Sequence, residues 1–341
     1  QENNSHGIFR ASKFFISEKG LADHDFTKEK YDQHLIWKSS HTIRKYINHS
    51  NNLSYFSQTT ALSIKRNQNY YEIFCLVGTE YRSFKSRSIF LCAGVVNSTY
   101  LAFSLLNLND EYFKLNHSLA SITPIMHLGL LQKYTNNNIA LPDLSWSLLP
   151  KGVNISGYLI SSFFIHKKIH LIAKRFFFRK IYSFFENFLS SLAFLTIFTN
   201  SEQTNTNLRI KKISNKKNQT PQYFLEIKNT NNHTLIKKYI KNELKKLSSF
   251  IKGRFHVIKF LTQHSKIGGD IHYGSTMPET KFMKSPINTS ILGEIRNAKN
   301  VYSCDASRLG YISSLPHTFT VMAVIDSSMP KIIKQLKKKE N

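Results

Sequence analysis

The stretch Asn300-Val-Tyr-Ser-Cys-Asp-Ala-Ser307 is followed closely by Pro316-His-Thr-Phe-Thr-Val-Met-Ala323, and Asp270-Ile-His-Tyr-Gly-Ser-Thr-Met277 stands upstream of both. Two of these three stretches contain a histidine, His272 or His317. Imidazole has a pKa near neutrality and can accept or donate a proton at physiological pH. Among the 14 histidines of the chain, these two are therefore the first candidates for chemistry.

A fourth stretch, Ser88-Ile-Phe-Leu-Cys-Ala-Gly-Val-Val-Asn-Ser-Thr99, predicts a strand, a glycine turn and a helix. Its first residues are apolar on both faces, as in a buried strand, and Gly94 ends the strand. Asn97 or Ser98 would cap a helix running through Leu101 to Leu106. Before this unit, short strands split by polar turns are expected at Tyr55 to Lys65, Tyr70 to Leu76 and Tyr81 to Phe84.

Residues 107–265 have a different pattern, with long apolar and aromatic segments. A strand pair is expected at Leu192 to Thr199 and Asn207 to Ile213, followed by a strand at Gln222 to Ile227. From Leu235 to Phe250, apolar residues recur at spacings of three and four with lysines on the other side, which predicts an amphipathic helix. This part is expected to be a separate domain of sheet plus helices.

The three C-terminal stretches resemble, in order and spacing, motifs of the glucose-methanol-choline (GMC) flavin oxidoreductases. Residues 300–307 are similar to the family's "Asn-Leu-Tyr-Val-x-Asp-Ala-Ser" strand and turn. Residues 316–323 are similar to its helix start, which has Asn or His and then Thr-x-x-Ala. Residues 270–277 are similar to its "His-x-x-Gly-Thr" segment with Ser275 inserted. Ser88 to Thr99 resembles a strand-turn-helix near the adenosine part of FAD, and Ser201 to Ile210 a substrate-domain strand.

This resemblance implies an α/β fold: an FAD-binding Rossmann-like domain, incomplete here, with a second α+β substrate domain of sheet plus helices. It implies that residues 1–106 are part of the FAD-binding domain and that residues 107–265 are the substrate domain. Residues 266–341 would return to the FAD-binding domain and carry the active-site histidines.

The resemblance also implies an FAD-dependent enzyme that oxidises the CH-OH group of an alcohol or sugar by hydride transfer to the flavin. His272 would accept the proton and His317 would hydrogen-bond the substrate oxygen; the reverse assignment is open. No metal is expected, and the electron acceptor is left open. The residues implied to bind the cofactor are Ala93, Gly94, Asp305, Ala306, His317, Thr318, Phe319 and, through its backbone toward adenine, Leu62.

One element of that family has no match in this chain. Its nucleotide-binding turn, Gly-x-Gly-x-x-Gly, lets the pyrophosphate approach the backbone, and none of the 13 glycines falls into that spacing. Because the chain begins with Gln1 rather than Met, we expect a fragment that lacks the N-terminal nucleotide-binding segment. The alternative is an inactive truncated remnant of such an enzyme.

The charge balance offers a different class of function. The chain has 47 Lys plus Arg against 21 Asp plus Glu, a net charge of +26. The cations are scattered, and a run of like charge occurs only at residues 331–339, which is typical of a solvated tail. No nucleic-acid partner is therefore expected; a basic protein that binds nucleic acid or anionic membranes is the alternative.

Membrane spanning and disulfides are both disfavoured. The most apolar stretch, Tyr182 to Phe198, is shorter than the roughly 20 residues that a spanning helix needs and contains Glu186. We expect a buried or amphipathic helix there. The basic, Phe-rich segment Phe163 to Phe185 leaves peripheral membrane contact open. Three widely spaced cysteines favour a reducing, cytoplasmic location, with an upstream signal peptide as the open alternative.

Overall fold

The computed structural model describes residues 7–9, 43–44, 46–47, 49–126, 144–148, 155–161, 192–201, 206–213, 222–229, 233–250, 256–265, 272–282, 284–314 and 317–338. The chain divides into two compact units. The first unit comprises Gln1–Tyr55, Ala120–Phe198 and Asn232–Ser265, and the second unit comprises Phe56–Leu119, Thr199–Asn231 and Lys266–Asn341.

The first unit is built on a seven-stranded sheet with the order β1-β9-β10-β11-β8-β14, in which β15 also pairs with β8. Along β8, Ser121, Thr123 and Ile125 are buried while the residues between them are more exposed, as the two-residue period of a strand requires. The strands are β1 (Gly7–Phe9), β8 (Ala120–Met126), β9 (Leu144–Leu148), β10 (Ile155–Ser161), β11 (Leu192–Thr199), β14 (His256–Val257) and β15 (Gln263–His264), and a 3-10 turn, η4, covers Lys259–Leu261.

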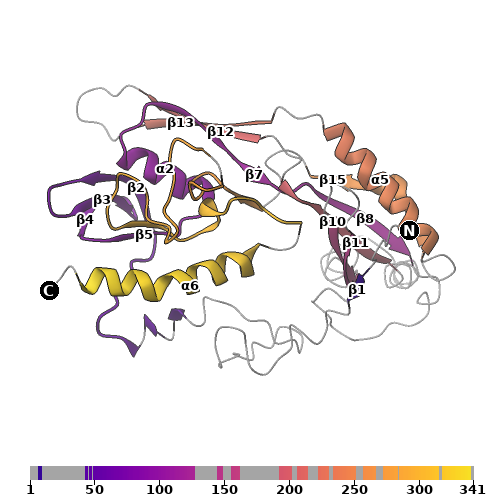
Figure 1. The fold of residues 1–341 in the computed structure, drawn as a ribbon, viewed down its shortest axis with the longest axis horizontal. Coiled ribbons are helices and arrows are strands. Elements are labelled where there is room, and N and C mark those ends of the chain that lie inside the picture. The colour runs from indigo at the N-terminus through magenta and orange to yellow at the C-terminus, as the bar shows by residue number, and fades with distance from the viewer. Residues whose placement is uncertain are drawn as a thin grey trace, which may run out of the picture. The chain divides into compact units, whose positions relative to one another are not determined.

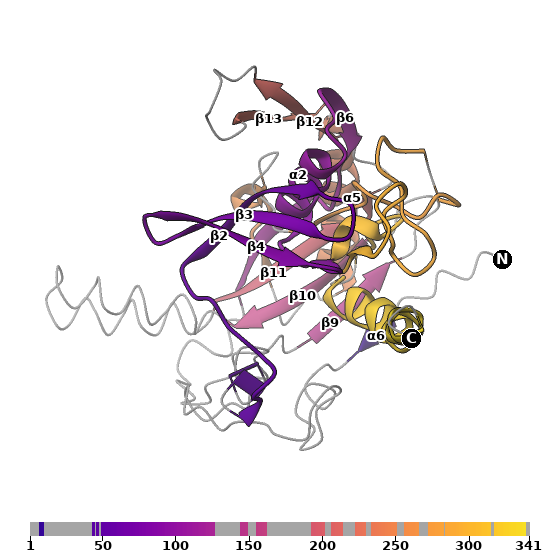
Figure 2. The same ribbon diagram turned by 90° about the vertical axis from the view of Figure 1, so that its left-hand side faces the viewer.

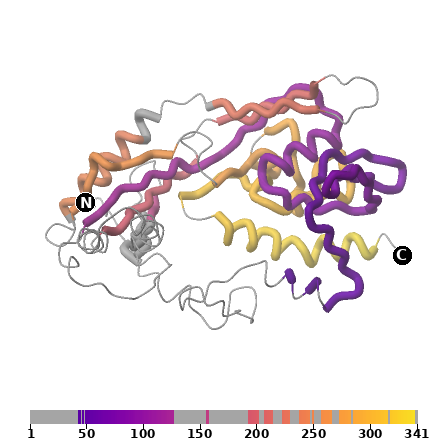
Figure 3. The backbone as a smooth tube through the Cα atoms, turned by 180° about the vertical axis from the view of Figure 1, so that it is seen from behind, coloured from indigo at the N-terminus to yellow at the C-terminus, as the bar shows by residue number. Residues whose placement is uncertain are grey.

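Helix α5 (His233–Phe250) belongs to the first unit and confirms the helix expected from the spacing of apolar residues. It contacts β14, and Figure 3 shows the helix from behind, in orange. Ile240 and Leu244, one turn apart, are buried. The lysines of the opposite side are exposed, so the helix is amphipathic as predicted.

In the second unit, β2 (Thr59–Arg66), β3 (Tyr71–Val77) and β4 (Glu80–Ser86) form an antiparallel meander. These are the three strands expected between Tyr55 and Phe84. The register of β2 on β3 shifts between Ala61 and Ser63, so Leu62 lies in a bulge.

Helix α2 (Val95–Leu105) lies between this meander and a second antiparallel sheet, β13-β12-β6 (Figure 2). The buried residues Leu101, Ala102 and Phe103 make it the centre of the core of the second unit. The helix begins earlier than expected: Gly94 is its N-cap and Ser98 lies inside it. The prediction that Asn97 or Ser98 caps the helix was wrong, because the Ser98 hydroxyl bonds elsewhere.

The second antiparallel sheet joins β6 (Asp110–Lys114), β12 (Thr206–Ile213) and β13 (Gln222–Asn229). β12 pairs with β13 along its whole length, from Thr206 opposite Asn229 to Ile213 opposite Gln222. The expected pairing of the 192–199 and 207–213 strands was wrong, because β11 instead pairs with β8 over seven positions.

A parallel pair, β5 (Ile89–Leu91) and β17 (Val301–Ser303), connects distant parts of the second unit. Leu91 and Val301 face the core around α2, whereas Tyr302 packs on Ile332 of α6 (Thr318–Lys337). The pair therefore lies between α2 and α6 (Figure 1). Parallel strands covered by helices on both faces are typical of α/β proteins, but a larger Rossmann-like sheet stays a prediction.

The unit boundaries differ from the expected domain ranges at three places. Residues 1–55 belong to the first unit, and residues 107–119 and 199–231 belong to the second. Which unit binds cofactor and which binds substrate stays a prediction. No helix within the described ranges is long and apolar enough to cross a membrane. The segment Phe163 to Phe185 lies outside the described residues, and Leu192 to Phe198 is strand rather than helix.

Candidate functional site

Two similar segments lie side by side at the ends of the parallel strands. After β5 the chain passes through Ala93 and Gly94 into α2, and Gly94 has a φ of 81°, which favours glycine. After β17 it passes through Asp305 into the 3-10 turn η5 (Ala306–Arg308). Ligands commonly bind beyond the carboxyl ends of parallel strands, which is where these two turns lie.

The Asp305 carboxylate ties the two turns together. One oxygen accepts hydrogen bonds from the Ser307 backbone N–H at 2.9 Å and the Ser307 hydroxyl at 2.6 Å. The other accepts a bond of 2.5 Å from the Ser98 hydroxyl. That hydroxyl oxygen in turn accepts a bond of 3.1 Å from the Ala93 N–H. Asp305 thus caps η5 and fixes it against α2, a structural task that the sequence did not indicate.

The short strand that follows His272 is fixed from both sides. β16 (Tyr273–Gly274) pairs with β7 (Asn116–His117), and the Ser118 N–H donates to the His272 carbonyl at 3.4 Å. On the other side, the Ser275 N–H donates to the Ala306 carbonyl at 3.1 Å. The approach is so close that a Cβ at Gly274 would lie 2.9 Å from the Ala306 oxygen, so glycine is required there.

His272 and His317 come together from these separate segments. Their ring centroids are 5.1 Å apart and the rings are nearly perpendicular, at 87°. His317 is the N-cap residue of α6, but its side chain makes no capping hydrogen bond. Both rings are partly buried. An imidazole can donate or accept a hydrogen bond and can transfer a proton, so the pair supplies the groups that general acid–base chemistry needs.

A cleft of about 470 Å³ opens beside these elements. Six of the residues expected to bind the cofactor contribute to its wall, whereas Phe319 and Leu62 do not. The lining residues are Ala93, Gly94, Val95, Val96, Asn97, Tyr273, Asp305, Ala306, His317, Thr318, Val321 and Met322.

The cleft combines apolar walls with positive backbone ends. Val96, Val321 and Met322 supply apolar surface, and the N-termini of both α2 and α6 border the same space. A helix N-terminus carries a partial positive charge and favours anionic or electron-rich groups. A volume of this size and a wall of this chemistry are common in small-molecule sites. The cleft can therefore bind a small, largely apolar ligand that carries polar or negative groups.

Several residues of the site could not be identified from the sequence. Tyr273 follows His272, Val321 and Met322 lie about one helical turn after His317, and all three line the cleft. A buried pair of hydroxyls, Thr99 and Thr276, joins α2 to the 272–277 segment at 2.6 Å. Thr99 and Thr276 each lie in one of the motifs quoted above, which could have marked them as candidates. That they bond to each other could not be predicted, because it depends on tertiary contacts.

Two expected cofactor residues lie elsewhere. The Leu62 carbonyl accepts a hydrogen bond of 2.6 Å from the Tyr100 hydroxyl, so this oxygen is engaged inside the protein. The Phe319 side chain is 46% exposed. That Leu62 and Phe319 contact a cofactor stays a prediction, and the contact would be made by their backbone N–H groups.

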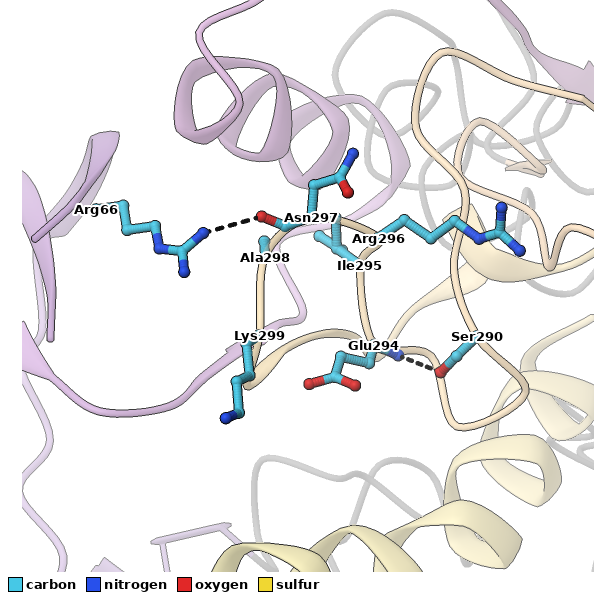
Figure 4. A pocket seen from close by; sticks show the side chains of 8 residues that line it. All are labelled: Arg66, Ser290, Glu294, Ile295, Arg296, Asn297, Ala298 and Lys299. Atoms are coloured by element: carbon cyan, nitrogen blue, oxygen red, sulfur yellow. Dashed lines mark hydrogen bonds between the residues drawn. The ribbon is translucent and has the colours of Figure 1, made fainter. Parts of the chain in front are cut away.

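A second cavity of about 330 Å³ lies at the loop before β17 (Figure 4). Arg66 donates to the Asn297 carbonyl at 3.3 Å across its edge, and Glu294 accepts from the Asn300 N–H at 2.7 Å. The cavity contains none of the residues expected to be functional, and the three cations around it, Arg66, Arg296 and Lys299, are all exposed. We regard the first cleft as the candidate site.

No protein-family model and no curated protein sequence matches the chain. Among solved structures, the fold is similar to pyridoxine 4-oxidase from Mesorbium loti, with a TM-score of 0.56 and 10% identity, over 84% of this chain and 59% of that chain. An FAD-dependent oxidoreductase from Chaetomium thermophilum matches with a TM-score of 0.48 and 10% identity, over 82% of this chain and 61% of that chain. The chain thus shares a fold with part of the oxidase and spans less than two thirds of its length.

Proposed function

We propose that this chain is part of an FAD-dependent oxidoreductase that oxidises the CH-OH group of an alcohol or sugar. The observation that carries the proposal is the contact of His272 with His317, 5.1 Å between ring centroids, with His317 in the wall of the cleft. The motif resemblance directed attention to these two histidines among 14. The similarity in fold to an enzyme named an oxidase supports the same class of reaction.

The residues of the cleft fit the ring portion of a flavin. Its walls are apolar at Ala93, Val96 and Met322, and it is bordered by two helix N-termini that favour the electron-rich edge of such a ring. The fit is incomplete at the pyrophosphate, because the sequence has no Gly-x-Gly-x-x-Gly turn. Ala93, Gly94, Ala306 and Thr318 would hold the cofactor, which when bound would supply the hydride acceptor.

The protein's own groups would then handle the proton and the developing charge. His272 would accept the hydroxyl proton of the substrate while His317 orients the oxygen; the exchanged assignment is the alternative. Backbone N–H groups of Thr318 and Phe319, in the first turn of α6, would stabilise negative charge at the cofactor edge. Asp305 would act by positioning, since its carboxylate already bonds Ser98 and Ser307.

The test is flavin binding followed by reduction. The purified chain is titrated with FAD and the visible absorption of bound flavin is recorded, and a panel of alcohols and sugars is then added without oxygen. We expect bleaching by at least one compound, and a fall of roughly 10²–10⁴-fold in the bleaching rate for His272→Gln or His317→Gln, the usual contribution of a general base. His256→Gln, at an exposed position of β14, is the matched control and should bleach normally. Failure to bind flavin, both by this chain and by a version extended upstream to include any nucleotide-binding segment, would contradict the proposal.

The exposed lysines of α5 favour a second candidate, binding of a polyanion. Lys237, Lys241 and Lys245 follow one another at four-residue intervals on one side of the helix, and Lys238 and Lys246 flank them. Their one acidic neighbour, Glu243, is buried and paired with Lys246 at 2.8 Å. Binding to nucleic acid or anionic vesicles that weakens steeply with salt and is lost in a Lys237→Glu, Lys241→Glu variant would support this function.

A further inference from the structure

Two of the three cysteines lie next to each other at the edge of the cleft. The ladder of β5 and β17 pairs Phe90 with Tyr302 and Leu91 with Ser303. The next residues in this register are Cys92 and Cys304. The Cys304 N–H donates to the Leu91 carbonyl at 2.8 Å, so the ladder continues to this point.

The register also places both thiols on the same face of the pair. Side chains two residues apart on a strand share a face, and Phe90 stacks on Tyr302 at 5.4 Å between ring centroids. Cys92 and Cys304 each lie two residues further on. Neighbouring strands are about 4.8 Å apart, and disulfide-bonded residues have Cα atoms about 4.4–6.8 Å apart. A bond between the two sulfurs thus needs little movement of the backbone.

The two thiols differ in accessibility and in the direction in which their pKa values are shifted. Cys92 is exposed and Cys304 is buried. A hydrogen bond from Cys304 lowers the pKa of Cys92 below its usual value, and the same bond raises the pKa of Cys304. An accessible thiol with a lowered pKa is the one that reacts, and a neighbouring thiol can then resolve it.

We propose that Cys92 and Cys304 form a site of reversible oxidation, in which Cys92 is the reactive thiol and Cys304 is the resolving thiol. The oxidant is a low-molecular-weight disulfide. Cys92 first loses its proton to solvent. Its thiolate attacks one sulfur of that disulfide, which forms a mixed disulfide and releases the first small thiolate, and this thiolate takes up a proton from solvent. The Cys304 sulfur then attacks the Cys92 sulfur, and the Cys304 proton passes to the second small thiolate, which leaves as a thiol. The two protein thiols thus lose two electrons to the small disulfide, which becomes two thiols.

The position of this pair gives oxidation a structural effect at the cleft. Cys92 directly precedes Ala93 and Gly94, and Cys304 directly precedes Asp305 and Ala306; all four following residues line the cleft. A disulfide would link covalently the two turns that Ser98 and Asp305 already join by a hydrogen bond. The two thiols would react in this way whichever ligand the cleft binds.

The experiment equilibrates the whole chain with oxidised glutathione, traps free thiols with an alkylating agent and identifies the peptides by mass spectrometry. We expect a linkage between Cys92 and Cys304 that dithiothreitol reverses. In the reduced protein, Cys92 should be alkylated on the order of tenfold or more faster than Cys75, which is buried on β3 and whose pKa burial raises.

Variants separate the two steps. Cys304→Ser should accumulate one glutathione on Cys92, because no resolving thiol remains, and Cys92→Ser should leave Cys304 reduced. Cys75→Ser is the matched control and should form the Cys92–Cys304 bond as the parent does. Two reduced thiols after equilibration of the parent chain, or linkage of either to Cys75, would overturn the proposal, and this measurement does not depend on any variant folding.

Discussion

Two segments of the candidate site approach each other closely at Gly274, where β16 passes η5. A Cβ added there would lie 2.3 Å from Ile312 Cδ1, 2.9 Å from the Ala306 oxygen and 3.0 Å from Ile312 Cγ1. Ordinary contacts are longer, so Gly274→Ala forces these groups apart. Overpacking of a core costs about 1–3 kcal/mol, offset by about 0.4–1 kcal/mol because alanine restricts the unfolded chain. We expect the free energy of unfolding to fall by about 1–2 kcal/mol.

A second substitution tests whether the clash is the cause. Ile312→Val removes Cδ1, the atom in the shortest contact, and by itself should cost about 0.5–1.5 kcal/mol. With that atom gone, Gly274→Ala should cost less, so the double variant should lose about 1 kcal/mol less than the sum of the single variants. Urea unfolding of the four proteins measures this coupling energy.

The control for this cycle is Gly78→Ala. Gly78, unlike Gly274, has a conformation that favours glycine, with φ of 59°, and nothing lies within 4 Å of the added Cβ. Its cost should therefore add to that of Ile312→Val within about 0.5 kcal/mol. Strict additivity of Gly274→Ala with Ile312→Val, or a Gly274→Ala variant as stable as the unsubstituted chain, would refute the claim that close packing against Ile312 and η5 excludes a side chain at Gly274.

Three further predictions concern titration and strain. Burial, with a smaller contribution from Tyr223, raises the pKa of Tyr100 to about 12. The contribution of neutral Tyr100 to the free energy of unfolding should therefore be fully present below pH ~10 and be lost between pH ~10 and ~12, and urea unfolding of Tyr100→Phe should show a smaller fall over this range. Burial and, to a smaller extent, the charge of Lys237 lower the pKa of His264. The free energy of unfolding should therefore decline as the pH drops below about 6.5, and thermal unfolding should show a smaller decline for His264→Gln. Ser275 is buried with φ of 68°, and its hydroxyl has no hydrogen-bond partner among the described residues. Ser275→Gly removes both the backbone strain and the unpaired hydroxyl, so it should raise the free energy of unfolding by about 1 kcal/mol in thermal unfolding. Ser275→Ala keeps the backbone strain and should raise it less.

Local patterns predicted the elements of the second unit well where neighbours in sequence are neighbours in space. The three strands of the meander are separated by short polar turns, and each pairs with the next, so alternation and turn residues were sufficient. The start of α2 was misplaced because Ser98 is a good capping residue by type. Its hydroxyl instead bonds Asp305, which is far away in sequence.

Contacts between distant segments set the limit of the sequence reasoning. β11 and β12 have suitable composition for a hairpin, yet β12 finds its partners in β6 and β13. The two histidines were selected by motif resemblance, and the structure brings their rings together; their chemical roles stay predictions. The Ser98–Asp305 bond and the Cys92–Cys304 contact both depend on the pairing of β5 with β17, which no periodicity in the chain indicates.

That pairing also has a consequence for biosynthesis. Ile89 aligns with Val301, so β5 acquires this neighbour only after 212 further residues have been made (301 − 89). At about 5–20 residues per second, translation of this interval takes on the order of 10–40 s. During that time the edge of β5 and the apolar residues around it, such as Leu91, lack their native cover on the ribosome. The nascent chain should therefore depend on chaperones that hold extended apolar segments until the last strand emerges.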